Sequence, residues 1–482
     1  MGLVICLGCR WTQRQKSPRL SLSKPPTPRI DHGLQGGGPA LLHDAALEGP
    51  HPVEDYIRVA RIRNPDIQAA QKRLESISFR VPVATSLPDP SLTTIAQPSP
   101  VQTAAGEFQF ILNANQKFPW FGKLATRGSV AEAEAAVARS ELAAVELDLI
   151  ARVKQVYFEL YYVQKSIAVT EAERSLLDQL RQVASTRYET GQTSQQDVLR
   201  ANLELSAIEN SLISLRQRLI AERARLARRL HAAPDTKLEA VSDLPAAQLP
   251  DNLQDLRDRA VAARPELLAA LNQINRDRQA IALAQLDYKP DVTLGFAWID
   301  VADAGLAPSA NGQDAVLLTA GVNLPIYRKR LAASVRSAEA GTIASSRRYD
   351  SLRDATLEEV TDLFTRAQSH DEMLQLFDHD ILPQASQTLE VSIEAYNVGE
   401  VDFLQLLDNW RQVLRYELGR IRLESDLRQV LAELEQAVGG WDLQQWAKPD
   451  PAGTDLDSSP DRHDLVEELP PPIPVNTATT LP

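Results

Sequence analysis

Two kinds of hydrophobic pattern alternate along this chain. Where apolar residues return every three or four positions, the pattern predicts a helix, and where apolar and polar residues alternate one by one, it predicts a strand. Both patterns occur twice in the same order, and the second copy begins about 200 residues after the first. Each copy therefore predicts a helix, two short strands, one very long helix, a Gly turn and a returning helix.

Short phrases mark the same repeat. Asn64–Ile67 is matched by Arg264–Leu267, and Tyr188–Gly191 is matched by Tyr396–Gly399. Solenoid proteins repeat units of about 20–50 residues, so this much longer period indicates a duplicated half-protein. The duplication favours one body made of two similar halves over two or three separate globular domains.

The alternating stretches are the candidate strands. Residues 107–118 place apolar side chains on one face and polar side chains on the other, with Ile111 as the exception, and residues 91–97 are their weaker partner. In the second copy, residues 292–298 and 316–324 alternate in the same way. The apolar positions are Phe108, Phe110, Leu112, Ala114, Val292, Leu294, Phe296, Trp298, Val316, Leu318, Ala320, Val322 and Leu324. One interpretation is a pair of β-hairpins buried in a soluble protein; the other is a membrane sheet.

The connections inside these hairpins are expected at residues 98–106 and 300–313, which are rich in Gly, Pro, Asn and Asp. Residues 120–188 contain no proline and predict one helix, roughly 100 Å long at 1.5 Å per residue. Residues 327–396 repeat this helix, with interruptions expected at Gly341 and Pro383. No compact globular protein has an obvious use for helices of this length.

Turn and cap residues place the remaining helix ends. The first helix is expected at about 53–80, with Pro82, Pro88 and Pro90 stopping it. The returning helices are expected at 194–231 and 402–438, with N-caps at their first residues. These are Ser194 and Asp402, and the left-handed residues that end the preceding helices are Gly191 and Gly399.

The domain organisation follows from these boundaries. We expect a possible lipoprotein signal remnant at 1–9, a flexible leader at 10–52, the first structural repeat at 53–231, a linker at 232–250, the second repeat at 251–440 and a Pro-rich acidic disordered tail at 441–482. The fold class is mainly α with a small β part, built from long antiparallel helical hairpins.

Composition narrows the function. The net charge of −13 disfavours nucleic acid as a partner. The sequence contains no run of about 18–20 apolar residues, which a membrane-spanning helix would need. A membrane β-strand needs only about 9–11 alternating residues. Both cysteines, Cys6 and Cys9, lie in the first ten residues, after a short apolar start. That start is similar to the end of a bacterial lipoprotein signal, with Cys9 as the residue to be lipidated; the alternative is an ordinary frayed N-terminus.

Four strands with one apolar face cannot close a barrel, because about eight are the minimum that surround a filled lumen. An open sheet edge is not tolerated in lipid. If the strands face a membrane, several chains must therefore contribute to one barrel, with the helices continuing beneath it as a second tube. This arrangement describes a conduit rather than a catalyst.

The order of elements and the repeat resemble the TolC family of outer-membrane efflux proteins. The phrases that carry the resemblance are Phe118–Lys123 after the second strand, Tyr188–Leu199 at the first turn and Tyr396–Asp408 at the second. The resemblance covers roughly residues 53–440. It implies a homotrimer whose twelve strands form one outer-membrane barrel in the lipid and whose helices form a periplasmic tunnel. It also implies docking on a periplasmic adaptor and an inner-membrane pump, and no cofactor.

The resemblance also implies site residues at the two Gly turns. The turns would meet the adaptor, and a gate would lie beside them. The adaptor-contact residues are Thr190, Gly191, Gln192, Val398, Gly399 and Glu400, and the gate residues are Asp197, Tyr396, Gln405 and Asp408. A Tyr396–Asp197 hydrogen bond would hold the two hairpins together, since a charged acceptor strengthens such a bond. Val401 stands where the family sometimes has a basic tie.

Other kinds of site are disfavoured by the sequence. No Ser-His-Asp order, P-loop or dinucleotide turn appears, so we expect no enzyme. His370 and His379 are too far apart for a helical metal pair, so no metal site is expected. The rival function is a periplasmic coiled-coil scaffold or adaptor. Phe118–Lys123 resembles members that serve heavy-metal and related resistance-nodulation-division pumps, but the cargo stays open among metals, drugs, small organics and secreted proteins.

Overall fold

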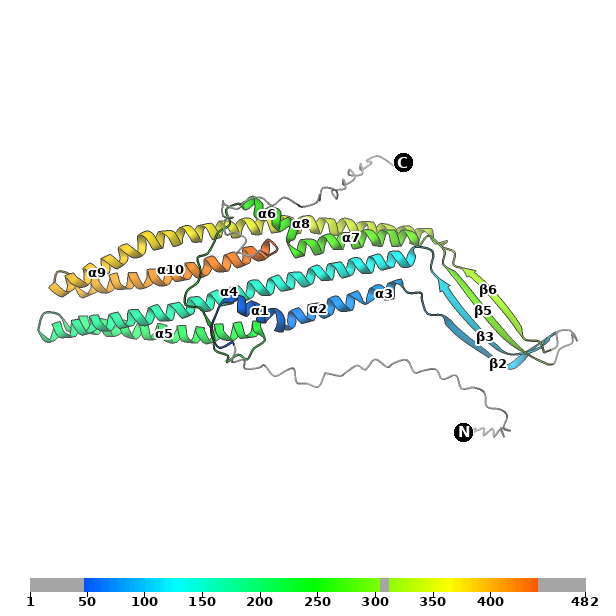
Figure 1. The fold of residues 1–482 in the computed structure, drawn as a ribbon, viewed down its shortest axis with the longest axis horizontal. Coiled ribbons are helices and arrows are strands. Elements are labelled where there is room, and N and C mark those ends of the chain that lie inside the picture. The colour runs from blue at the N-terminus through cyan, green and yellow to red at the C-terminus, as the bar shows by residue number, and fades with distance from the viewer. Residues whose placement is uncertain (1–46, 304–311, 441–482) are drawn as a thin grey trace, which may run out of the picture. The chain divides into compact units, whose positions relative to one another are not determined.

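The computed structural model describes residues 47–303 and 312–440, which belong to one compact unit, His43–Pro482 (Figure 1). The helices are α1 (Val53–Arg63), α2 (Pro65–Ser78), α3 (Arg80–Thr85), α4 (Lys123–Glu189), α5 (Gln195–Leu230), α6 (Leu253–Ala263), α7 (Pro265–Leu286), α8 (Arg328–Leu376), a π-helical turn (Phe377–Ile381), α9 (Leu382–Val398) and α10 (Phe403–Ala437). The strands are β1 (Gly49–His51), β2 (Ser91–Thr103), β3 (Gly106–Phe118), β4 (Leu238–Ala240), β5 (Val292–Ala302) and β6 (Ala315–Val322). Within these ranges, no helix is both long and apolar enough to cross a membrane.

The first long hairpin forms as the sequence predicts. Helix α4 has 67 residues, which corresponds to roughly 100 Å, and α5 returns along it. Gly191 has a φ of +76°, which favours glycine, and turns the chain between the two helices. The Ser194 hydroxyl then accepts the N–H of Gln196 and caps α5. The predicted cap and turn residues are both confirmed.

The second long hairpin differs from the first. Helix α8 continues through Gly341, so the interruption predicted there is wrong. A glycine in a helix is unfavourable but tolerated, and the preceding Ala338, Glu339 and Ala340 are good helix formers. The change of register predicted at Pro383 is confirmed: a π-helical turn, Phe377–Ile381, precedes Pro383 in the first turn of α9. Gly399 and Asp402 then act as predicted, with a φ of +84° and a cap to the N–H of Gln405.

The helix predicted at about 53–80 is divided into α1, α2 and α3. The first break comes at Asn64, whose side chain caps α2 and whose neighbour Pro65 starts that helix. The end predicted at Pro82 is wrong, because α3 runs on to Thr85. A proline is tolerated in the first turn of a helix, where its missing N–H would have no partner.

The four longer strands form one antiparallel sheet in the order β2-β3-β5-β6. Two hairpins supply it, one from each half of the chain, and β3 pairs with β5 where the halves meet. The loop predicted at 98–106 is shorter than expected, because β2 extends to Thr103 after a register shift between Ala96 and Val101. The sequence of that stretch is rich in proline, which a strand accepts at bulges and edges.

A second, two-stranded sheet was not predicted. β1 pairs in parallel with β4, so the leader assigned to 10–52 and the linker assigned to 232–250 each contain a strand. Tyr56 explains this pairing. Its hydroxyl donates to the Glu239 carbonyl at 3.0 Å and accepts the Glu239 N–H at 3.2 Å. Strands of three residues are too short for an alternating pattern to identify them.

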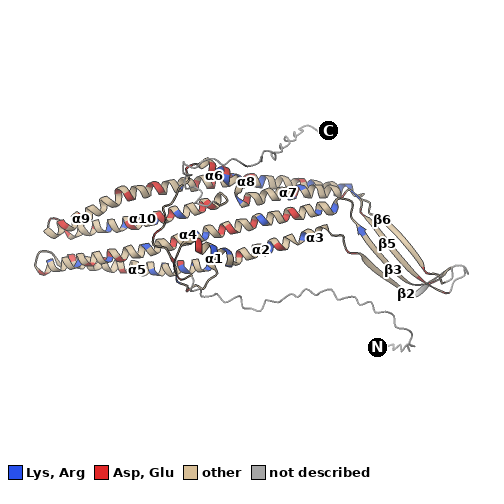
Figure 2. Ribbon diagram, in the orientation of Figure 1, with Lys and Arg blue, Asp and Glu red and all other residues tan. Residues whose placement is uncertain are grey.

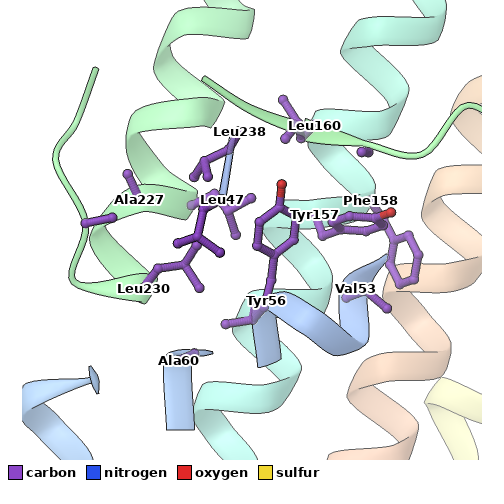
Figure 3. Packing of buried hydrophobic residues seen from close by; sticks show 14 of the residues in the cluster. Leu47, Val53, Tyr56, Ala60, Tyr157, Phe158, Leu160, Ala227, Leu230 and Leu238 are labelled. Carbon is purple, nitrogen blue, oxygen red and sulfur yellow. The ribbon is translucent and has the colours of Figure 1, made fainter. Parts of the chain in front are cut away.

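This small sheet lies beside a hydrophobic core that joins α1, α4 and α5 (Figure 3). Tyr56 and Tyr157 are fully buried in it, and their rings are 5.9 Å apart. A second core joins the two long hairpins, with Leu177 and Leu212 from the first and Trp410 from the second. The two halves of the chain therefore share buried contacts along their helices as well as the β3–β5 pairing.

Candidate functional site

Three regions of the unit carry the features that the sequence points to. The first is the four-stranded sheet, whose apolar side chains align in rows across the strands. One row is Leu92, Ala114, Phe296 and Leu318, and the next is Thr94, Leu112, Trp298 and Val316. Leu92 is 69% exposed and Leu318 is 83% exposed. No helix lies over the four strands in Figure 1, so the apolar face has no protein cover among the described residues.

The opposite face of the sheet carries most of its polar side chains. Thr93 and Asn113 are paired there, as are Asn115 and Gly295. Ile111, the exception in the sequence pattern, pairs with Ile95 on one side and Ile299 on the other. These three isoleucines form an apolar row of their own on this face. A sheet with one apolar and one polar face is typical of a boundary between lipid and water.

The two outer strands of this sheet have open edges. β2 pairs with β3 alone and β6 pairs with β5 alone in the described chain. Each outer strand thus presents a row of unpaired N–H and C=O groups, which cost several kcal/mol each if they enter lipid without partners. The exposed apolar face and the open edges together disfavour the interpretation as hairpins buried in a soluble protein.

The second region is the junction where β3 passes into α4, and its chemistry was not predicted. Lys123 Nζ lies 2.8 Å from Asp291 Oδ1, and the two side chains are only 4% and 8% exposed. Lys123 also donates to the Lys289 carbonyl at 3.1 Å, and Lys117 Nζ lies 3.0 Å from Asp291 Oδ2. Trp120 donates its backbone N–H to Asp291 at 3.1 Å. The end of the first hairpin is thereby fixed to the start of the second.

Asp291 lies before β5 and is the central acceptor of this junction. Burial alone would raise its pKa, but hydrogen bonds from Lys123, Lys117 and the Trp120 N–H outweigh burial and lower the pKa to about 2. The backbone N–H of Asp291 donates to the Asn323 side chain, and the Asn323 N–H donates back to the Asp291 carbonyl at 3.2 Å. The available sequence signals were Asp291, which stands directly before the strand predicted at 292–298, and the lysine in Phe118–Lys123.

The third region comprises the two tip turns, Thr190–Gln192 and Val398–Glu400. All six predicted adaptor-contact residues are exposed there. Val398 is 72% exposed, although it is apolar. The turns stand at the ends of α4 and α9, so the length of α4 separates them from the sheet. Their exposure leaves them free to contact another molecule.

The predicted gate residues lie near these turns, but the predicted hydrogen bond is wrong. No hydrogen bond joins Tyr396 to Asp197 among the described residues. Asp197 instead accepts the Thr193 hydroxyl, on its own hairpin. Tyr396 is 3% exposed and packs against Phe403, with ring centroids 5.4 Å apart. Burial raises the pKa of Tyr396, and the nearby charge of Asp197 raises it further.

Arg187 ties the two hairpins in place of that bond. Its guanidinium donates to the Tyr396 carbonyl and, at 3.0 Å, to the Asn397 carbonyl. It also lies 5.0 Å from the centre of the Tyr396 ring. Sequence reasoning missed Arg187 because backbone carbonyls, its acceptors, leave no trace in a sequence. Its only signal was its place beside the repeated Tyr188–Gly191 phrase.

The remaining gate residues, Gln405 and Asp408, are exposed on α10. The Asp408 carboxylate accepts a weak hydrogen bond from the Gln412 side chain at 3.5 Å, and its charge acts on Arg411 of the same helix. Each therefore faces away from the chain's own core and stays available to a neighbouring molecule or to water. Among the described residues, no three His, Cys, Asp or Glu side chains gather to hold a metal ion. Cys9 lies outside the described residues.

Comparisons with known proteins agree with this geometry. The pattern of the outer membrane efflux protein family matches residues 56–230 and 256–440. The cobalt-zinc-cadmium resistance protein CzcC of Cupriavidus metallidurans is 22% identical over 408 residues, which cover 83% of this chain and 92% of CzcC. The outer membrane protein TolC of Vibrio cholerae is 24% identical over 325 residues, 64% of this chain and 72% of TolC. The crystal structure of the outer membrane protein VceC of Vibrio cholerae superposes with a TM-score of 0.68 and 22% identity, covering 80% of this chain and 96% of VceC.

Proposed function

The chain belongs to the outer membrane efflux protein family and is an outer-membrane exit duct, and from that premise we propose how its parts make the duct. Three copies contribute four strands each to one closed twelve-stranded barrel in the outer membrane. The helical hairpins of the three copies form a tunnel that continues into the periplasm. The duct is passive, so energy comes from the pump to which it connects.

The observation that carries this proposal is the sheet itself. Its apolar face is uncovered, and the outer edges of β2 and β6 have no partner strand within the described chain. Pairing β2 of one copy with β6 of the next satisfies both edges and turns the rows that contain Leu318 and Val316 toward lipid. The polar face, which includes Thr93 and Asn113, then lines the water-filled interior. Three copies give twelve strands, above the number at which side chains fill the lumen.

The tip turns are the proposed docking site for a periplasmic adaptor. Thr190–Gln192 and Val398–Glu400 are exposed, and they lie at the ends of the helices farthest from the sheet. Val398 offers an apolar contact, while Gln192 and Glu400 are polar where the family has an apolar residue. The contact with the adaptor is therefore expected to be more polar than in the family's best-known members.

The gate is proposed to lie just above these turns. Arg187 holds the two hairpins of one chain together, and three copies of Asp408 would face the tunnel axis. Three carboxylates near one axis repel one another and attract cations. Gln405 and Val401, which replace an acid and a base, leave this gate less charged than in the resembling family members. Opening would require the Arg187 contacts to the Tyr396 and Asn397 carbonyls to break.

The proposed cargo is a metal cation, exported through a resistance-nodulation-division pump. Two observations support it: the relative named as a cobalt-zinc-cadmium resistance protein and the Phe118–Lys123 phrase. However, Lys123 of this phrase also binds Asp291 at the junction of β3 and α4. That structural role would require the lysine whatever the cargo. Lipidation of Cys9 would add an anchor in the outer membrane, and we retain it as part of the proposal.

Extraction and conductance test the proposal together. We expect the protein to fractionate with the outer membrane, to require detergent for release and to form discrete conductance steps in a planar bilayer. A periplasmic scaffold or adaptor would be released by osmotic shock without detergent and would give no conductance. That result would replace the duct with the rival function.

A further inference from the structure

We propose that the junction between β6 and α8 binds the head groups of anionic phospholipids in the periplasm-facing leaflet of the membrane. We define this second junction as Leu324, Ile326, Tyr327, Arg328, Lys329 and Arg330. The proposal rests on the membrane sheet proposed above, because only that sheet places the junction at the level of the head groups. It adds a lipid preference that the sheet alone would not have.

The apolar part of the second junction is open to its surroundings. Leu324, Ile326 and Tyr327 are 71%, 66% and 71% exposed. They follow directly after β6, whose Leu318 and Val322 are also exposed, so one apolar surface continues from the sheet into the junction. Exposed apolar and aromatic side chains at the end of membrane strands are typical of the boundary between hydrocarbon and head groups.

The charged part follows in the next three residues. Arg328, Lys329 and Arg330 are exposed, and none of them forms an ion pair within the described ranges. Arg328 lies over the Tyr288 ring at 5.6 Å, so its guanidinium is held near the surface. The neighbouring acids, Asp287 and Asp291, are in contact with Lys123 of the first junction. Figure 2 shows basic residues where the strands meet the helices.

The position of these three cations is unfavourable without an anion. They occupy the first turn of α8, which contains no acidic residue. The first turn of a helix carries partial positive charge, so three adjacent cations there repel it and one another. A shallow hollow of about 530 Å³ is lined by residues 326–330, mostly through their apolar atoms. Anionic head groups match both the charge and the apolar floor of this surface.

Lipid is favoured over a protein partner because the apolar residues and then the basic residues are arranged in the order of the hydrocarbon and head-group layers of a bilayer. The apolar residues adjoin the sheet and the basic residues lie on the helical side, as hydrocarbon and head groups do. Three cations in contact with an anionic surface are expected to raise affinity by roughly fivefold each at low salt. Screening reduces that gain at physiological ionic strength.

The test compares lipid preference in the full chain. The protein is reconstituted into vesicles of phosphatidylcholine alone and of phosphatidylcholine with phosphatidylglycerol, and the phospholipids retained after detergent extraction are counted by native mass spectrometry. We expect the wild type to enter both vesicles and to retain phosphatidylglycerol preferentially. The triple variant Arg328→Gln, Lys329→Gln, Arg330→Gln should lose at least about tenfold of that preference.

The matched control is Arg278→Gln, Arg348→Gln, Arg415→Gln, which removes three exposed helical arginines that form no ion pair in the described structure. The control should retain the wild-type preference, and the preference should weaken at high salt. An unchanged preference in the junction variant would overturn the lipid proposal alone. Failure of the wild type to enter either vesicle would overturn the membrane sheet, and the lipid proposal with it.

Discussion

The two halves of the chain have the same order of elements, but the charged residues at their strand–helix junctions and at their tip turns make different interactions. At the first junction, Lys123 is buried against Asp291, whereas at the second, Arg328 and its two basic neighbours are exposed. At the tips, the first half supplies the Arg187 side chain, and the second half supplies two backbone carbonyls and the Tyr396 ring. The two halves share the order of elements, whereas their charged residues at the junctions and tips differ.

The largest expected effect on the free energy of unfolding comes from the buried Lys123–Asp291 pair at the first junction. Lys123→Met should lower the free energy of unfolding by about 3 kcal/mol, because it leaves Asp291 buried with fewer partners. Denaturant unfolding in detergent, followed by circular dichroism, measures the change. The control is Lys117→Met, which removes the half-exposed partner of the same carboxylate and should cost less than about 1 kcal/mol.

A double variant makes the same comparison sharper. If Lys123 and Asp291 act as a pair, Lys123→Met combined with Asp291→Leu should cost clearly less than the sum of the two single changes. Equal costs for Lys123→Met and Lys117→Met would mean that burial does not distinguish the two lysines. The first junction would then resemble the exposed second junction after all.

The next effect is a loss of stability in acid. The pKa of Asp291 is about 2 in the folded chain, below the value of about 3.9 expected when it is unfolded. Its contribution is therefore complete above about pH 4 and is lost as the pH falls from about 4 to 2. The contribution is roughly 2–3 kcal/mol. The free energies of unfolding of the wild type and Asp291→Asn, plotted against pH, should converge over that interval. A constant difference between the two proteins would contradict the low pKa of Asp291.

A smaller effect is expected at the tip. Arg187→Ala should weaken the contact between the hairpins by about 1–2 kcal/mol, since one charged donor serves two carbonyls and an aromatic ring. Single-channel recordings should show more frequent opening. Arg181→Ala, which removes an arginine paired only within α4, is the control and should leave opening unchanged. Wild-type opening in Arg187→Ala would show that the tie between the halves lies elsewhere.

The smallest effect concerns Asp408, which is exposed on α10. Asp408→Ala should reduce the preference for cations over anions in planar-bilayer conductance, with little change in stability. The reason is that three carboxylates at one axis raise the local cation concentration. Ion selectivity that stays the same would remove Asp408 from the gate. Gln405→Ala should have no effect on selectivity, because Gln405 carries no charge.

The sequence predicted whatever depends on periodicity and on local turn chemistry. The long helices, the four longer strands, Gly191, Gly399, Ser194 and Asp402 were all identified in this way. It did not predict the β1–β4 sheet, because three-residue strands have no measurable period. It also missed Asp291 and Arg187, whose partners lie far away in the sequence and include backbone groups. The proposed Tyr396–Asp197 bond failed because Thr193, four residues from Asp197, provides a nearer donor.

Cross-linking the edge strands tests the closed sheet most directly. One cysteine replaces Ser91 or Thr93 in β2 and another replaces Leu317 or Thr319 in β6, and native outer membranes are then oxidised. The controls are the wild type and the variants with only one introduced cysteine, which show any products that involve Cys6 or Cys9. If three copies close one barrel, a β2–β6 pair in register gives covalent products that end at three chains. Products that stop at one chain, or that continue beyond three, would contradict the closed twelve-stranded sheet.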